Sequence, residues 1–277
     1  MSNLLTVRNL KVTDLRTQAE IIHGVSFELK KNSCLGIVGE SGSGKSMTAK
    51  AILGLTNPWL CSEGTAELSD GHGVLDLLQQ DESTLRSIRG QRICMILQDA
   101  MSAFDPLERI GSQMSETFIE NKGICRSEAM NMVVEALQMI NMPEPEQVLK
   151  KYSHQLSGGM LQRCMVATAL AMKPDIIVAD EPTTALDSIN QRLVVEEFKL
   201  LRQEMGTALI FISHDLGVVQ HLADQLLVMR CGEPVEYGEA RSIFKTPQHE
   251  YTKYLIDSRL EMSKSFQKAM KRGEVSA

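Results

Sequence analysis

The sequence predicts an α/β fold with a helical lobe inserted into it, and three observations carry this prediction. A Gly-rich loop over residues 39–46 lies between an apolar run typical of a buried strand and a run typical of a helix. From about Ala100 to Met172, apolar residues recur at helical spacing and methionine is frequent. From Asp175 onward, apolar runs alternate with a helical pattern again. Because the helical block interrupts this alternation, we expect an α/β core that carries the block as an insertion.

The Gly-rich loop reads Gly-Glu-Ser-Gly-Ser-Gly-Lys-Ser and matches the phosphate-binding loop pattern. Its glycines let the backbone fold tightly enough for successive N–H groups to point at one anion. Lys45 then supplies a positive charge for the terminal phosphates, and the Ser46 hydroxyl can ligate Mg²⁺. A plain surface turn is the alternative, which the strand before and the helix after disfavour. We expect the nucleotide to contact Gly39, Glu40, Ser41, Gly42, Ser43, Gly44, Lys45, Ser46 and Met47.

The composition narrows the class of protein. A chain of 277 residues can form one large domain or two lobes, and its net charge of −6 argues against a nucleic-acid partner. The 6 cysteines form no C-x-x-C pair, which disfavours zinc and disulfide frameworks and favours a reducing cytoplasm. The N-terminus has no signal-peptide pattern, and no apolar run approaches the roughly 20 residues that span a bilayer. Any membrane role is therefore expected to be that of a peripheral subunit.

The elements follow in order along the chain. Early alternating stretches predict strands at residues 4–12, 20–29 and 63–78. The core pattern predicts strands at residues 33–38, 92–97, 175–180, 208–213, 225–230 and 233–237. Helices are expected at residues 47–53, 83–87 and 188–205. The Met-rich stripe within residues 100–172 indicates core packing, although such adaptable surfaces also suit partner docking.

The tail past Tyr251 is expected to be helical. Met262, Phe266 and Met270 form one stripe beside basic residues at positions 264, 268, 271 and 272. Such a tail could touch a membrane or a partner, but a solvated terminal helix is the favoured interpretation.

Two carboxylates and a second glycine pair indicate further residues that bind or hydrolyse the nucleotide. Asp180 and Glu181 follow an apolar strand, so they are expected at the sheet edge where α/β proteins bind ligands. There Asp180 would hold Mg²⁺ opposite Ser46, and Glu181 would polarise a water for attack on the γ-phosphate. In Leu-Ser-Gly-Gly-Met at residues 156–160, Ser157 indicates a helix N-cap that leaves backbone N–H groups open to an anion.

Together these motifs resemble the ATPase subunit of an ABC transporter. The resemblance covers residues 4–255 and adds Gln98, the turn at residues 184–187 and His214 in the family's order. It implies a P-loop NTPase core with a small antiparallel β subdomain. The ABC ATPase domain would span residues 1–255, with its helical lobe at about 100–172 within a RecA-like core, and a tail would follow at residues 256–277. ATP and Mg²⁺ are the implied cofactors.

The resemblance also implies a head-to-tail dimer. Ser157, Gly158 and Gly159 of one subunit would cap the ATP held by the loop of the other, and Asp187 would lie at the dimer seam. Lys45, Gln98, Glu181 and His214 are the implied catalytic residues: Gln98 would sense Mg²⁺ and the attacking water, and His214 would contact the γ-phosphate. The implied metal-binding residues are Ser46, Gln98 and Asp180.

One feature departs from the family pattern. The family usually stacks adenine on an aromatic residue near the first strands, but no Tyr, Trp or Phe lies between Val12 and Ile22. Leu15 or Ile21 is therefore expected to offer a weaker apolar platform. This departure affects the selectivity for adenine rather than the binding of triphosphate.

Three stretches, at residues 98–106, 180–187 and 249–255, resemble the dipeptide/oligopeptide/nickel importer branch. Residues 158–163 and the short C-terminus are more similar to its nickel or metal–metallophore ATPases. This implies nickel import, free or chelated, at the cytoplasmic face of the membrane. The implied partners are a second, non-identical ATPase subunit, two integral-membrane permease subunits and, indirectly, an extracytoplasmic substrate-binding protein.

Three alternatives remain open. The chain could serve a dipeptide or oligopeptide importer, because the ATPase need not touch the cargo. A non-transport ABC ATPase of translation or DNA repair fits less well, since such proteins carry two cassettes or long coiled coils. An ordinary P-loop kinase or GTPase would leave Gln98 and the residue 156–160 motif without a role.

Overall fold

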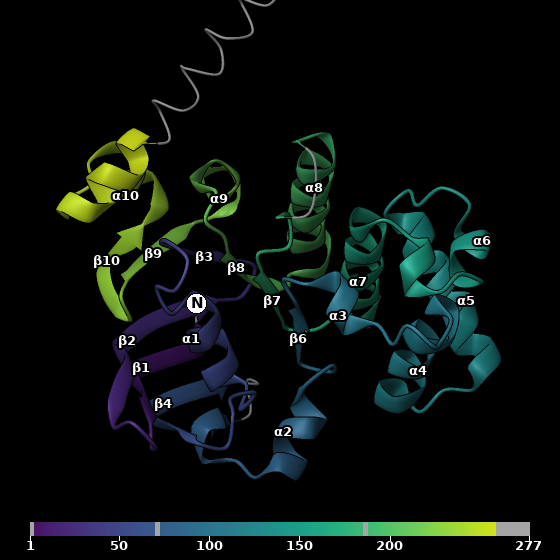
Figure 1. Ribbon diagram of the computed structural model, residues 1–277, viewed down its shortest axis with the longest axis horizontal. Coiled ribbons are helices and arrows are strands. Elements are labelled where there is room, and N and C mark those ends of the chain that lie inside the picture. Colours follow the sequence, from purple (N-terminus) through teal and green to yellow (C-terminus); the bar gives the residue numbers. More distant parts are fainter. Residues whose placement is uncertain (1–2, 70–72, 185–187, 259–277) are drawn as a thin grey trace, which may run out of the picture.

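The computed structural model describes residues 3–69, 73–184 and 188–258. Two sheets and a set of helices make up this part of the chain (Figure 1). Asp187, expected at a dimer seam, and the tail from residue 259 onward lie outside the described residues.

The central sheet has six strands in the order β10-β9-β3-β8-β7-β6. Every neighbouring pair is parallel except β10 and β9, which are antiparallel. The strands are β3 (Cys34–Val38), β6 (Ile93–Ile96), β7 (Ile176–Asp180), β8 (Ala208–Ile212), β9 (Gln225–Arg230) and β10 (Glu233–Glu239). Because the phosphate-loop strand β3 lies in the middle, strands from the last quarter of the chain flank it on both sides.

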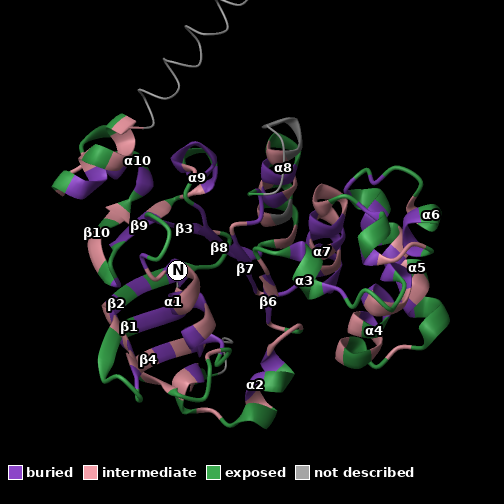
Figure 2. Cartoon of the chain, in the orientation of Figure 1, coloured by how far each residue is buried: buried purple, intermediate pink, exposed green. Residues whose placement is uncertain are grey.

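Both faces of this sheet are covered, which is why its inner strands are apolar throughout. In β3, Cys34 and Val38 join one hydrophobic cluster, whereas Leu35 and Ile37 join the other. The same alternation divides β7, β8 and β9 between the two clusters. The inner strands are accordingly coloured as buried in Figure 2.

The second sheet is antiparallel, with the order β2-β1-β4-β5. Its strands are β1 (Asn3–Asp14), β2 (Ala19–Lys30), β4 (Leu60–Ser69) and β5 (Val74–Asp76). Its apolar side chains share one cluster with helix α1 (Lys45–Ile52) and one face of the central sheet. The early alternating strands therefore form the small antiparallel β subdomain that the sequence predicts.

The helical lobe follows β6 and lies at one end of the molecule in Figure 1. Its helices are α3 (Ala100–Ala103), α4 (Ile110–Lys122), α5 (Arg126–Met139), α6 (Pro145–Leu149) and α7 (Gly158–Met172), with a 3₁₀ turn at Ser153–Gln155. The other helices are α2 (Glu82–Ile88), α8 (Ser188–Met205), α9 (Leu216–Leu222) and α10 (Ala240–Lys245), with a 3₁₀ turn at Leu77–Gln79. The last described residues, 250–258, are also helical.

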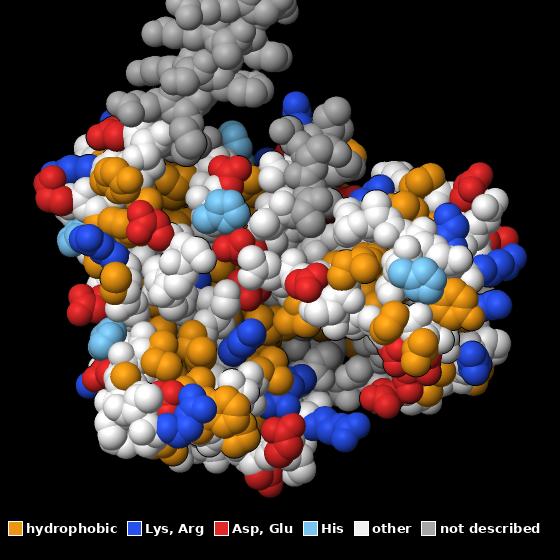
Figure 3. Space-filling model, viewed as in Figure 1, with side chains coloured by type: hydrophobic (Ala, Val, Ile, Leu, Met, Phe, Trp, Pro, Cys, Tyr) orange, Lys and Arg blue, Asp and Glu red, His pale blue; other side chains and the backbone are white. Residues whose placement is uncertain are grey.

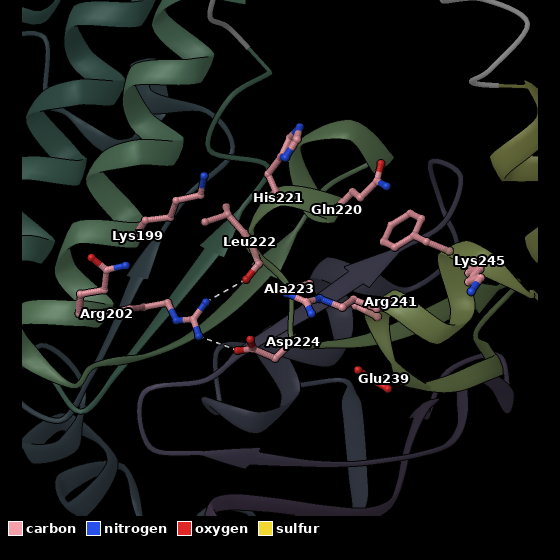
Figure 4. A pocket seen from close by; sticks show the side chains of 13 residues that line it. Lys199, Arg202, Gln220, His221, Leu222, Ala223, Asp224, Glu239, Arg241 and Lys245 are labelled. Carbon is pink, nitrogen blue, oxygen red and sulfur yellow. Dashed lines mark hydrogen bonds and ion pairs between the residues drawn. The ribbon is translucent and has the colours of Figure 1, made fainter.

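At the edge of the sheet where β3 and β9 begin, a charged clamp joins three elements. The Arg202 guanidinium on α8 pairs with the Asp224 carboxylate at 2.6 Å and donates to the Leu222 carbonyl at 2.9 Å (Figure 4). Asp224 also accepts the Cys34 N–H at 2.7 Å. A groove of about 900 Å³ opens here between α8, α9 and α10. It lies at the edge opposite the phosphate loop, and the clamp fixes the start of the strand that carries that loop.

Candidate nucleotide site

The phosphate loop leaves the buried end of β3 and is shaped by close backbone contacts. Gly39 has φ +152°, and a Cβ there would lie 2.1 Å from the Met229 carbonyl oxygen. Gly44 has φ +98°, and a Cβ there would lie 2.5 Å from the Ile22 side chain. Larger residues would therefore displace β9 or β2 at these two positions. The Gly232 N–H donates to the Ser43 carbonyl at 3.1 Å, so the turn after β9 supports the loop from the other side.

Lys45 is buried within this loop and folds back on it. Its Nζ donates to the Gly39 carbonyl at 2.9 Å and to the Glu40 carbonyl at 2.8 Å. Burial lowers the pKa of Lys45, and the charges of Glu181 and Asp180 oppose that shift. The ammonium is thus held over the loop, where a bound phosphate would accept a hydrogen bond from it.

The first carboxylate, Asp180, faces the end of the loop. Its Oδ1 accepts a hydrogen bond from the Ser46 hydroxyl at 2.7 Å. Asp180 ends β7 and is 3% exposed, and burial is the main cause of its raised pKa. A hydroxyl and a carboxylate in contact at the phosphate loop are oxygen donors of the kind that Mg²⁺ takes. The residues present therefore fit the expected metal.

The second carboxylate, Glu181, gathers side chains from the ends of three neighbouring strands. Its Oε2 accepts from Gln98 Nε2 at 3.2 Å and from Thr184 Oγ1 at 2.9 Å. The same oxygen lies 3.1 Å from His214 Nδ1. Glu181 has φ +46°, a left-handed backbone that is uncommon outside glycine and frequent at functional sites. Because β6, β7 and β8 are adjacent and parallel, residues that follow them in sequence meet at one carboxylate.

The second glycine pair begins α7 in the helical lobe. Ser157 is the N-cap, as the sequence predicts, and its Oγ accepts the Met160 N–H at 3.2 Å. Ser157 is exposed, and Gly158 and Gly159 are half-buried. Figure 1 shows α7 well apart from α1, so this helix start does not reach the phosphate loop of its own chain.

An aromatic residue does lie beside the first turn, although it comes from elsewhere in the sequence. The Leu15 N–H donates to the Trp59 carbonyl at 2.9 Å, and the Arg16 guanidinium lies 4.5 Å from the Trp59 ring centroid. Asp14 orients Arg16 through hydrogen bonds at 2.9 Å and 3.2 Å. Leu15 is 52% exposed and Trp59 is 39% exposed. Trp59 immediately precedes β4 and so lies far in sequence from residues 12–22, where the family's aromatic residue is expected.

Known proteins that are similar to this chain identify its family. The sequence pattern of the family described as "ABC transporter" matches residues 22–184. The chain belongs to the ABC transporter family. It is 42% identical to the metal-staphylopine import system ATP-binding protein CntD of Staphylococcus aureus, over 98% of each chain. It is 41% identical to the dipeptide transport ATP-binding protein DppD of Bacillus subtilis, over 93% of this chain and 77% of that protein.

Solved structures agree with this ABC transporter assignment. The ATP-binding cassette MJ0796, a dimer in a post-hydrolysis state bound to ADP and Pi, superimposes with a TM-score of 0.76. It is 26% identical and covers 86% of this chain and 99% of its own. The α/β core with an antiparallel β subdomain and an inserted helical lobe is therefore the ABC ATPase fold.

The ABC ATPase site gathers most of the sequence-predicted residues. Lys45, Ser46 and Asp180 meet at the loop, and Gln98 and His214 meet at Glu181. Met47 is half-buried against the core that contains α1, and Asp187 lies outside the described residues. Within residues 3–69, 73–184 and 188–258, no cluster of three or more His, Cys, Asp or Glu could hold a metal, and no helix is long and apolar enough to span a membrane.

Proposed function

We propose that this chain is the ATP-hydrolysing subunit of an ABC importer that takes up nickel, free or chelated. The Ser46–Asp180 hydrogen bond at the phosphate loop, with Lys45 in that loop and Glu181 next to Asp180, carries the ATPase part of this proposal. The full-length likeness to a metal-staphylopine import ATPase supports the cargo part.

The nucleotide site would work through residues that already have the required contacts. Lys45 would keep the Gly39 carbonyl and turn from the Glu40 carbonyl to the terminal phosphates of ATP, and Ser46 and Asp180 would hold Mg²⁺. When bound, Mg²⁺ supplies positive charge that offsets the phosphate charge. Glu181 would accept a proton from the attacking water. Gln98 would orient that water and sense Mg²⁺, while His214 would contact the γ-phosphate.

The site of one chain is incomplete without a partner. Ser157, Gly158 and Gly159 begin α7 away from the loop of their own chain, so we propose that they cap ATP bound by a second ATPase subunit. The resemblance favours a non-identical subunit. Asp187, outside the described residues, would lie at this seam.

A groove of about 320 Å³ offers a docking surface for the two permease subunits. It lies between β6, α3, α4 and α7, and its apolar lining includes Phe104 and four methionines, Met95, Met114, Met165 and Met172. Figure 3 shows hydrophobic side chains reaching the surface in the helical part of the molecule. Met101 and Leu107 nearby in the chain are 47% and 84% exposed. Because Leu97 lines this groove and Gln98 is the next residue, a permease segment seated here would lie close to the part of the chain that leads into the catalytic cluster. This supports a peripheral subunit on the cytoplasmic face, with a substrate-binding protein reached through the permeases.

The cargo has one principal alternative. DppD-like peptide ATPases are nearly as identical, but this chain spans only 77% of the B. subtilis protein and 98% of the metal-staphylopine protein. Short peptides are therefore the alternative to a metal or metal–chelator cargo.

Deletion of the gene tests the cargo. We expect the deletion to abolish uptake of radioactive nickel, supplied free and with a small chelator in parallel, while sensitivity to a toxic dipeptide stays intact. Resistance to the dipeptide with normal nickel uptake would assign the subunit to a peptide importer instead. Complementation with the Glu181→Gln gene controls for loss of the whole complex, because that product assembles but does not hydrolyse ATP.

A further inference from the structure

One tyrosine near the C-terminal end of the described chain contacts the phosphate loop directly. Tyr251 is 6% exposed and lies in the helix over residues 250–258. Its hydroxyl oxygen accepts the Glu40 backbone N–H at 3.0 Å. The Arg230 guanidinium, at the end of β9, lies 5.0 Å from the centre of the Tyr251 ring. The ring is therefore held by packing and charge while the hydroxyl reaches the loop.

The segment before this tyrosine is fixed to the central sheet. The two carboxylate oxygens of Glu236, on β10, accept the backbone N–H groups of Gln248 and His249 at 2.9 Å and 3.1 Å. His249 Nδ1 in turn accepts the Tyr251 N–H at 3.1 Å. These contacts determine where the helix starts and so determine where the Tyr251 hydroxyl lies.

The peptide that Tyr251 binds is the one that holds Lys45. The Glu40 N–H and the Gly39 carbonyl belong to the same planar peptide unit. Its N–H donates to Tyr251, and its carbonyl accepts Lys45 Nζ at 2.9 Å. Gly39, on one side of this peptide, has φ +152°, a conformation that few other residues adopt. Without a bound N–H, rotation of this peptide would move the acceptor of the Lys45 ammonium.

We propose that Tyr251 is a positioning residue for the phosphate-binding lysine, acting through the Gly39–Glu40 peptide. The inference rests on the proposed ATP binding by this loop. Tyr251 contacts the loop through the Glu40 backbone N–H. It fixes the direction of one carbonyl, which fixes the Lys45 side chain before ATP arrives and lowers the cost of ordering it on binding.

The test compares three Tyr→Phe variants of the full chain, each of which removes one hydroxyl and keeps the ring. Tyr251→Phe loses the bond to Glu40. Tyr237→Phe loses bonds of the same kind, to the Glu28 N–H at 3.1 Å and to Gln225 at 2.9 Å, on strands β2 and β9. Tyr254→Phe changes an exposed ring on the same helix as Tyr251. The probe is a non-hydrolysable ATP analogue, measured by calorimetry, with thermal unfolding of each variant in parallel.

We expect Tyr251→Phe to weaken binding of the analogue by about threefold to tenfold, the range of one lost hydrogen bond. Tyr237→Phe and Tyr254→Phe are expected to bind as the unmodified chain does. Unchanged binding by Tyr251→Phe would overturn the proposal, and so would an equal loss in Tyr237→Phe, which would indicate a general effect on stability. Lys45→Ala separates this outcome from the proposed function: if that variant binds the analogue normally, the loop is not the ATP site at all.

A second comparison distinguishes an effect of Tyr251 on the position of Lys45 from an effect on the packing of the loop. In the Lys45→Arg background, the longer side chain cannot use the same carbonyl in the same way. The further loss from Tyr251→Phe is therefore expected to shrink to less than about twofold. An undiminished loss in that background would overturn the proposal that Tyr251 acts through Lys45.

Discussion

The chain begins two helices with glycine-rich motifs, and the two differ in how much of the protein surrounds them. The loop before α1 packs against β9, the turn after β9 and the helix of Tyr251, and its lysine is buried. The start of α7 carries an exposed Ser157 whose side chain caps only its own helix. The first motif is surrounded by other parts of its own chain, whereas the second begins at an exposed residue. We infer that one chain supplies the phosphate loop of a nucleotide site, and we propose that the start of its α7 completes the site of a second subunit.

The largest expected effect concerns the nucleotide site around the phosphate loop. Glu181→Gln removes the proton acceptor but keeps the size of the side chain, so we expect hydrolysis to fall at least about 100-fold while ATP binding persists. Phosphate release and analogue binding measure the two separately. Glu135→Gln, at an exposed position on α5, is the matched control. Hydrolysis at the unmodified rate would remove Glu181 from the mechanism.

The second prediction concerns the exposed start of α7. A bulky side chain there would block the nucleotide of a partner subunit. Ser157→Arg places a long side chain at the exposed start of α7, and we expect ATP turnover by the assembled transporter to fall at least about tenfold. Analogue binding to the isolated chain should stay unchanged, because the loop lies elsewhere. Ser157→Ala controls for the lost cap, which costs about 1 kcal/mol of stability. If Ser157→Arg turns over ATP normally in the assembled transporter, α7 does not complete a partner's site.

The smallest expected effect concerns a buried carboxylate on α8 that lies near α7. Glu197 on α8 has a buried Oε2 that accepts no hydrogen bond among the described residues, and Arg163 on α7 is the nearby opposing charge. Burial raises the pKa of Glu197 from 4.5 to about 7. The folded chain therefore keeps a proton that the unfolded chain has released, and this contribution to stability is lost as the pH rises from 4.5 through 7.

Glu197→Gln mimics the protonated form at every pH. We expect a flatter dependence of the unfolding temperature between pH 5 and pH 8, and at pH 8 an increase of about 2 to 4 °C, allowing for partial solvent screening. Differential scanning calorimetry across that range measures both. Glu196→Gln, next in sequence but exposed and paired with Lys199, should leave the pH dependence unchanged. Parallel pH curves for Glu197→Gln and the unmodified chain would contradict the prediction.

The order of motifs along the chain predicts most of the nucleotide site. Gln98, Glu181 and His214 each follow an apolar strand, and parallel strands end at one edge of a sheet, so their meeting follows from the pattern. The residue pattern does not predict helices α9 and α10, of seven and six residues, which pack against β3 and against β9 and β10.

Tyr251 and Trp59 escape prediction for a different reason. Tyr251 contacts a backbone N–H that lies 211 residues earlier, and Trp59 reaches the first turn through a backbone hydrogen bond. Neither contact depends on a residue pattern, since any residue offers its main chain. Only the packing of distant segments brings Tyr251 to the phosphate loop and Trp59 to the first turn, and composition or spacing cannot reveal that.

The position of β3 between β8 and β9 also has a consequence for biosynthesis. The ribosome makes the phosphate loop early, but the groups that shape it come from Met229, Gly232 and Tyr251, close to the end of synthesis. Contacts so distant in sequence form slowly and late. We therefore expect the nascent chain to acquire its nucleotide pocket only after residue 251 has left the exit tunnel, so that premature termination yields a chain without a functional ATP site.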